Sequence, residues 1–191
     1  PYSVAEGATT VGTVTASDAD AGTTITFSLS GTDSGDFAID SSSGAITFNS
    51  APDFETPGSV ANSNAYSLNV VASDGTNSDT EAIVVNVTDA NDNSPVLSVS
   101  TPYSVAENTT SVGTVSASDT DANSTITYTL SGTDAAKFDI NSASGAISFA
   151  SAPDFETPGS VANSNAYSLN VVASDGTNTD TEAIVVNVTD A

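Results

Sequence analysis

Positive charge is almost missing from this sequence of 191 residues, which has one basic residue, Lys137, against 24 acidic residues and a formal net charge of -23. A protein that binds nucleic acid needs Lys and Arg to neutralise phosphates, so the composition excludes that class of partner. It argues equally against binding to an anionic membrane surface. So large a negative excess destabilises a compact fold by self-repulsion unless bound cations offset it.

Cysteine, tryptophan and methionine are also absent. Without cysteine the chain has no disulfide framework and no thiol chemistry. No apolar run approaches the length of a membrane-spanning helix and no signal peptide is visible, so we expect no membrane insertion. The chain begins and ends within a repeated pattern, and we therefore expect it to be a piece of a longer protein.

The pattern is an internal repeat. The phrase YSVAE begins at Tyr2 and again at Tyr103, which is 101 residues later. Residues 50–90 return as residues 151–191 with one change. The two copies are therefore expected to share one fold, joined by the segment DANDNSPV at residues 89–96. Arrays of this kind more often extend a protein and space its other domains than catalyse a reaction.

Each copy has the pattern of an all-β domain. Apolar and polar residues alternate in short segments rich in β-branched and aromatic residues, and Gly, Asn, Asp and Ser separate these segments. In the first copy the segments are residues 2–5, 10–17, 24–30, 37–39, 44–48, 65–72 and 81–87. About seven short strands in about 100 residues fit a Greek-key β-sandwich. We therefore predict an all-β protein of two tandem seven-stranded sandwiches.

The expected core of each copy is small. In the first copy it consists of Val4, Val11, Val14, Ile25, Phe27, Leu29, Phe37, Ile39, Ile46, Phe48, Tyr66, Leu68, Val70, Ile83, Val85 and Val87. A core of this size indicates limited intrinsic stability.

Acidic residues gather where the predicted strands end. Successive strands of a sandwich mostly run in opposite directions, so Glu6, the DFE motif at residues 53–55 and Asp89 are expected at one end of the first copy. The DAD motif at residues 18–20 and Asp74 are expected at the other end. When two such copies follow one another, the DANDN segment lies between two acidic ends.

Five ordered motifs resemble those of cadherin repeats, which are extracellular calcium-binding sandwich modules. They are the Glu of VAEG, the DAD of ASDAD, the DFE in place of the family's Asp-Arg-Glu, the sequence ASDG, and the linker DANDNSP. Together they span the whole chain. Departures from the family pattern are Phe54 in place of Arg, an extra loop TPGSVANSN at residues 56–64, and a second DAD that reads DTDANS. The near-identical copies and missing cysteine resemble a bacterial cadherin-like array within a large surface or secreted adhesin.

The resemblance implies about three calcium ions at the junction, each with six to eight oxygen ligands. The implied ligands are Glu6, Asp53, Glu55, Asp89, the carbonyl of Ala90, Asn91, Asp92, the carbonyl of Asn93, Asp119, Asp121, Asp175 and a carbonyl near Asn123. Asp92 and Asp121 would each be shared between ions. The implied domains are residues 1–90 and 99–191, with residues 91–98 as the calcium-binding linker. The outer acidic groups, which have no linker beside them, are expected to bind more weakly.

Other interpretations of these acids are possible. Asp and Asn near Gly usually occupy turns, which we expect for Asp33, Asp36, Asp134 and Asp139. DADAG begins like an EF-hand loop, but position twelve is Leu29 and the flanks are strands. The DFE carboxyls could form the acid and base of a glycosidase. This motif recurs in both copies without an aromatic cleft, so we expect no enzyme. A solvated face is expected for Asp79, Glu81, Asp180 and Glu182.

Two functions are compatible with these features. In the first, calcium stiffens the repeats into a structural extender that holds another domain away from a cell surface. In the second, the repeats bind carbohydrate or a second copy of themselves. The absence of tryptophan removes the exchanged-tryptophan contact of animal cadherins, and most of the 5 Tyr and 7 Phe are assigned to the core. We therefore favour the extracellular extender, with calcium and neighbouring repeats as its partners.

Overall fold

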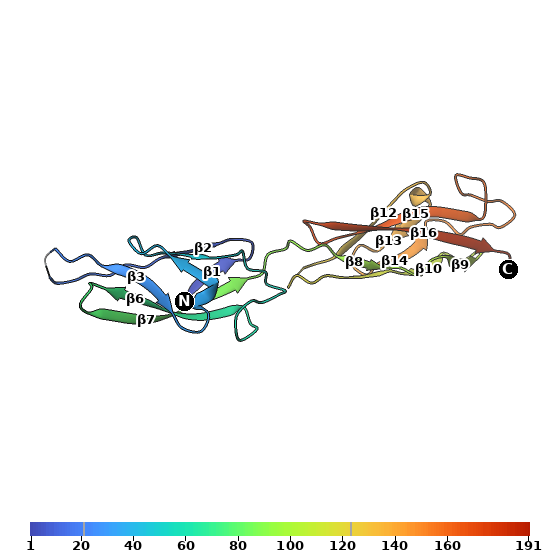
Figure 1. Cartoon of the computed structure of the whole chain (residues 1–191). Helices are drawn as coiled ribbons and strands as arrows, with labels where there is room; N and C mark the ends of the chain where they lie inside the picture. Colours follow the sequence, from blue (N-terminus) through green and yellow to red (C-terminus); the bar gives the residue numbers. More distant parts are fainter. Residues whose placement is uncertain (21, 123) are drawn as a thin grey trace. The chain divides into compact units, whose positions relative to one another are not determined.

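The computed structural model of the chain describes residues 1–20, 22–122 and 124–191. The chain divides into two compact units, unit 1 (Pro1–Ala90) and unit 2 (Asn91–Ala191), and both consist of strands joined by loops (Figure 1). Within the described residues, no helix is long and apolar enough to cross a membrane. The predicted all-β sandwich class is confirmed.

Unit 1 is built from two sheets. Its elements are β1 (Tyr2–Ala5), β2 (Thr10–Thr13), β3 (Thr26–Ser30), η1 (Ser34–Asp36), β4 (Phe37–Ile39), β5 (Ala45–Phe48), β6 (Ala65–Ser73) and β7 (Ser78–Thr88). One sheet has the order β1-β7-β6-β3 and the other β2-β5-β4. The first strand pairs in parallel with the last, from Tyr2 opposite Val85 to Ala5 opposite Thr88, and the remaining pairs are antiparallel.

Unit 2 repeats this arrangement. Its elements are β8 (Val96–Ser98), β9 (Tyr103–Ala106), β10 (Ser111–Thr114), β11 (Ser116–Ser118), β12 (Thr127–Ser131), η2 (Ala135–Lys137), β13 (Phe138–Ile140), β14 (Ala146–Phe149), β15 (Ala166–Ser174) and β16 (Thr179–Thr189). The sheets have the orders β12-β15-β16-β9 and β10-β14-β13, and β8 pairs with β11.

The pair β8 and β11 differs from the pattern of unit 1. Residues 10–17 were predicted as one strand, but β2 ends at Thr13. In unit 2 the equivalent chain continues into β11, because the linker supplies β8 as its antiparallel partner. Leu97 of β8 is 9% exposed and belongs to the core cluster of unit 2. Part of the segment predicted as a linker is therefore packed into unit 2.

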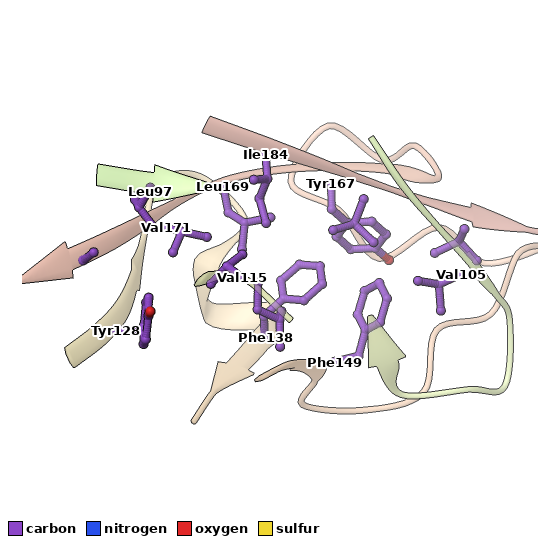
Figure 2. Packing of buried hydrophobic residues seen from close by; sticks show 14 residues of the cluster. Leu97, Val105, Val115, Tyr128, Phe138, Phe149, Tyr167, Leu169, Val171 and Ile184 are labelled. Atoms are coloured by element: carbon purple, nitrogen blue, oxygen red, sulfur yellow. The ribbon is translucent and has the colours of Figure 1, made fainter. Parts of the chain in front are cut away.

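The predicted core residues of unit 1 are all buried or packed against the buried cluster, together with Tyr2, Phe54 and Ala72. Three aromatic rings form the centre of each core, and Figure 2 shows those of unit 2, Phe138, Phe149 and Tyr167. The two Phe ring centroids lie 4.3 Å apart, and the Tyr ring meets each Phe edge-on. Each such pair contributes about 0.5–1.5 kcal/mol beyond the area it buries.

Candidate metal sites

Glu6, Asp53 and Glu55 come together at the C-terminal end of unit 1, and one carboxylate oxygen of each lies within 4.8 Å of the others. Glu6 is only 8% exposed. Its carboxylate accepts hydrogen bonds from the backbone N–H of Phe54 at 2.7 Å and of Ala90 at 2.7 Å. A single side chain thus links the end of β1, the DFE motif and the last residue of the unit.

The local chain direction explains why Glu6 points into this cluster. The strand β1 ends at Ala5, and the next N–H, that of Glu6, still donates to the carbonyl of Thr88 at 3.0 Å. Gly7 then adopts a φ of 73° and donates its N–H to the carbonyl of Pro52 at 2.9 Å. Glycine adopts this conformation without strain. The turn brings the chain next to the segment that carries the DFE motif.

Unit 2 repeats the cluster at its own C-terminal end with Glu107, Asp154 and Glu156. The Glu107 carboxylate accepts the backbone N–H of Phe155 at 3.1 Å and of Ala191 at 3.3 Å. The same geometry in both units shows that the fold of one repeat suffices to assemble these carboxylates.

A second kind of cluster lies at the N-terminal end of unit 2, where Asp119, Asp121 and Asp175 bring carboxylate oxygens within 4.8 Å of one another. Asp121 is 5% exposed and Asp175 is 8% exposed. The backbone N–H of Asp121 donates to Asp119 Oδ1 at 3.0 Å. Within the described residues, the Oδ2 atoms of Asp119 and Asp175 are buried and have no hydrogen-bond partner.

The linker asparagines are bonded to this cluster. Asn93 donates to Asp121 from its backbone N–H at 3.1 Å and from Nδ2 at 2.7 Å. The carbonyl of Asn93 accepts Nδ2 of Asn178 at 2.8 Å, and Nδ2 of Asn91 donates to the carbonyl of Asp175 at 3.3 Å. The chain before β8 is therefore fixed to the acidic end of unit 2.

Two of the sequence-based assignments in unit 2 are corrected by the structure. Asp180 was expected on a solvated face, but its Oδ2 accepts the backbone N–H of Leu97 at 2.8 Å and so holds β8 in place. Asp139 was expected in a turn, but it lies within strand β13. The bond of Asp180 depends on β8, a partner that the local sequence does not specify. Asp139 lies in the second-copy equivalent of residues 37–39, which were themselves predicted as a strand.

Asp33 and Asp134 precede short 3-10 turns as expected, but their side chains are not ordinary turn side chains. Each is 3% exposed. Asp33 accepts the backbone N–H of Val60 at 2.8 Å and of Ser67 at 2.6 Å, and Asp134 repeats both bonds with Val161 and Ser168. Their partners lie far away in the sequence, so no local signal could have revealed this role.

The remaining predicted ligands are placed by the structure as follows. Asp89 and Ala90 are half-buried directly after β7, and Asp92 is exposed, with Oδ1 accepting Nδ2 of Asn93 at 3.1 Å. Asn123 lies outside the described residues. At the N-terminal end of unit 1, Asp18 and Asp74 bind neighbouring backbone N–H groups, and the described residues there form no three-carboxylate group of the kind seen in unit 2.

The electrostatics of these clusters favour a bound cation. The one basic side chain, Lys137, lies in η2, outside both kinds of cluster. Burial raises the pKa of Asp175, but the N–H groups of Asn178 and Thr177 donate to its carboxylate and hold the pKa below the ordinary value. These sites offer only oxygen ligands, and they include ionised carboxylates. Such a donor set fits the ligand preference of calcium.

The lowered pKa of Asp175 predicts how the calcium-free protein responds to acid. The ionised carboxylate contributes to stability in full above the ordinary value of 3.8, and the contribution is lost as the pH falls through the lower folded-state pKa. An NMR titration of the Asp175 carboxyl carbon in chelator should therefore show a midpoint below 3.8. A midpoint at or above that value would contradict the hydrogen-bonding arrangement described.

Comparison with known sequences identifies relatives among much longer proteins. Human Protocadherin Fat 4 is 37% identical over 194 residues, covering 96% of this chain and 4% of that protein. Mouse Cadherin EGF LAG seven-pass G-type receptor 2 is 44% identical over 137 residues, covering 66% of this chain and 4% of that protein. The chain therefore spans a small fraction of the length of these relatives.

Solved structures agree with the fold. Mouse Cadherin-23 EC22-24 is 28% identical with a TM-score of 0.71 and covers 100% of this chain and 62% of that chain. Human Protocadherin-24 EC1-2 is 22% identical with a TM-score of 0.81, covers 99% of this chain and 93% of that chain, and supports the fold alone. The family model described as "Cadherin domain" matches residues 1–88 and 101–189. The chain belongs to the cadherin family, as two tandem cadherin repeats of the extracellular kind.

Proposed function

We propose that the two repeats form a calcium-rigidified extender in a cell-surface adhesin and are not an enzyme. In this proposal residues 91–98 act as a calcium-binding linker between domains of residues 1–90 and 99–191. The observation that carries it is the Asp119, Asp121 and Asp175 cluster. It bonds to linker asparagines, and two of its buried carboxylate oxygens have no hydrogen-bond partner in the described part of the chain. Ions bound jointly by the first repeat, the linker and the second repeat would limit their relative motion.

The proposed ligands are those implied by the family resemblance. The C-terminal end of unit 1 supplies Glu6, Asp53 and Glu55, and its last residues supply Asp89 and the carbonyl of Ala90. The linker and the N-terminal end of unit 2 supply Asn91, Asp92, Asn93, Asp119, Asp121 and Asp175. About three ions would fit this number of oxygens at six to eight ligands each.

The mechanism depends on charge and on oxygen geometry. Calcium supplies positive charge between carboxylates that otherwise repel one another, and this chain's residues provide and orient the oxygens. Asn93 and Asn178 act before any ion binds, since they fix the linker backbone on the second repeat. The ordering cost of binding is therefore smaller than for a flexible linker.

The extender function predicts a change of conformational freedom on calcium binding. Small-angle X-ray scattering of residues 1–191 should indicate a narrower distribution of sizes in calcium than in chelator, because bound ions would join the two repeats. Identical scattering profiles in the two conditions, at calcium concentrations that saturate binding, would refute the extender function. In that case calcium could still bind and stabilise the repeats, but it would not restrict their relative motion.

Replacing Asp92 by Asn should weaken calcium binding about tenfold or more, because a charged ligand shared by two ions is lost. Asp139→Asn is the matched control, since it removes the same charge from an exposed position in β13. Isothermal titration calorimetry compares the two variants with the parent protein. Equal weakening in both variants would mean that bulk charge, and not a specific ligand, controls binding.

A further inference from the structure

The inserted loop at residues 56–64, here called the brace loop, is a tightly bonded structure. Ser59 is 5% exposed. Its hydroxyl donates to the carbonyl of Ser63 at 2.7 Å and accepts the backbone N–H of Ser63 at 3.0 Å. Asn62 turns the chain with a φ of 55° and donates its N–H to the carbonyl of Ser59 at 2.8 Å. Such mutual bonds fix the loop in one conformation.

Buried groups of the sandwich anchor the brace loop. The Asp33 carboxylate accepts the N–H of Val60, and the hydroxyl of Tyr66 accepts the N–H of Gly58 at 3.1 Å. Asp33 and Tyr66 are each 3% exposed. Hydrogen bonds to a charged acceptor are the stronger kind. The loop is therefore held by groups that are themselves immobilised in the core.

The far end of the brace loop bonds to the DFE motif. Nδ2 of Asn64 donates to the carbonyl of Phe54 at 2.9 Å. The N–H of Phe54 donates to Glu6, and its ring packs against the core cluster. Phe54 is thus fixed by its N–H, its carbonyl and its side chain. Its two neighbours in the chain are Asp53 and Glu55, which belong to the carboxylate cluster.

We propose that the brace loop is a positioning device for calcium ligands, with Asn64 as the positioning residue. Asn64 holds Phe54, and Phe54 sets the directions in which Asp53 and Glu55 leave the backbone. The cluster is then pre-organised before calcium arrives, which lowers the ordering cost of binding. This proposal rests on the proposed calcium-binding function, and it assigns a role to the insertion that distinguishes this chain.

A purely structural role for the loop makes a different prediction, and the repeat supplies the control. Asn165 donates Nδ2 to the carbonyl of Phe155 at 2.9 Å, as Asn64 does to Phe54. Its cluster is Glu107, Asp154 and Glu156, and residues 1–191 contain one DANDN segment, at residues 89–93. Substitutions at Asn64 and Asn165 therefore remove the same bond, but only Asn64 belongs to the end of unit 1 that precedes the linker.

The test uses Asn64→Ala and Asn165→Ala in the chain of residues 1–191. Among the residues that the structure describes, the Oδ1 atoms of both asparagines are buried and have no hydrogen-bond partner, so each substitution also removes an unsatisfied acceptor. For this reason we expect both variants to fold, with nearly equal loss of stability in urea unfolding with chelator. In calcium titration, Asn64→Ala should raise the dissociation constant of the tightest sites by about three- to tenfold, the equivalent of one hydrogen bond. Asn165→Ala should leave these sites unchanged.

Two results would count against the proposed role of the brace loop. Equal weakening of the tightest sites by both substitutions would show an effect of general stability. Unchanged calcium affinity in Asn64→Ala would show that Asp53 and Glu55 need no positioning. An unmodified chain that fails to bind calcium would refute the proposed function itself, which is a separate outcome.

Discussion

Removal of calcium is expected to lower the thermal unfolding midpoint of the chain by on the order of 10 °C. A ligand at 100 times its dissociation constant stabilises the folded state by about 2.7 kcal/mol per site. A change of 1 kcal/mol shifts the midpoint of a domain of 60–100 residues by about 4–8 °C. The carboxylate clusters also repel themselves when no cation is present. Differential scanning calorimetry in calcium and in chelator measures the shift.

Specificity is checked by replacing the divalent cation with monovalent salt at equal ionic strength. Sodium chloride screens surface charge, but it does not fill the coordination shell of a calcium site. The midpoint should therefore recover only partly in sodium chloride. Full recovery would show that general screening of the net charge of -23, and not site binding, stabilises the protein. Equal midpoints in calcium and chelator would contradict both explanations.

Replacement of Asp33 by Ala should destabilise unit 1 by about 3 kcal/mol, because two hydrogen bonds to a charged group are lost and buried donors remain. The donors are the backbone N–H groups of Val60 and Ser67. Urea unfolding in chelator measures this change without any contribution from bound calcium. Asp134→Ala should have an effect of similar size on unit 2, since the same two bonds recur there.

Asp36→Ala is the matched control for Asp33. It removes one negative charge three residues away, from a half-buried position in η1 where unit 2 carries Lys137. We expect a change within about 0.5 kcal/mol, as for most surface substitutions. If the two variants lose equal stability, the buried hydrogen bonds of Asp33 have no special role, and its side chain behaves as an ordinary turn residue.

Much of the fold was predictable because its causes are local. Strand positions follow from alternation, and strands β1 and β4 occupy the predicted residues. Core membership follows from the same alternation, since each strand buries one face. The acidic clusters were also predictable in outline. Glu6 and the DFE motif each lie at a strand end, and antiparallel topology brings such ends together.

The features that escaped prediction depend on partners far away in the sequence. The bond from Leu97 to Asp180 joins residues 83 positions apart in the sequence, and the bonds of Asp33 reach the brace loop and β6. The residues around an aspartate do not reveal whether its side chain is buried or exposed in a turn. Only the tertiary structure distinguishes the two cases. Phe54 was recognised as a departure from the family pattern, but its bond to Asn64 required the path of the loop.

The parallel pairing of β1 with β7 determines how a repeat responds to tension. When the two ends of unit 1 are pulled apart, β1 is drawn toward its start and β7 toward its end. Their four-residue ladder, from Tyr2 opposite Val85 to Ala5 opposite Thr88, is then loaded along the strands, so that its bonds share the force and do not open one at a time. Glu6 lies directly beyond this ladder and accepts the N–H of Ala90. The residues that gather carboxylates at the end of the repeat therefore also close the ladder that carries mechanical load.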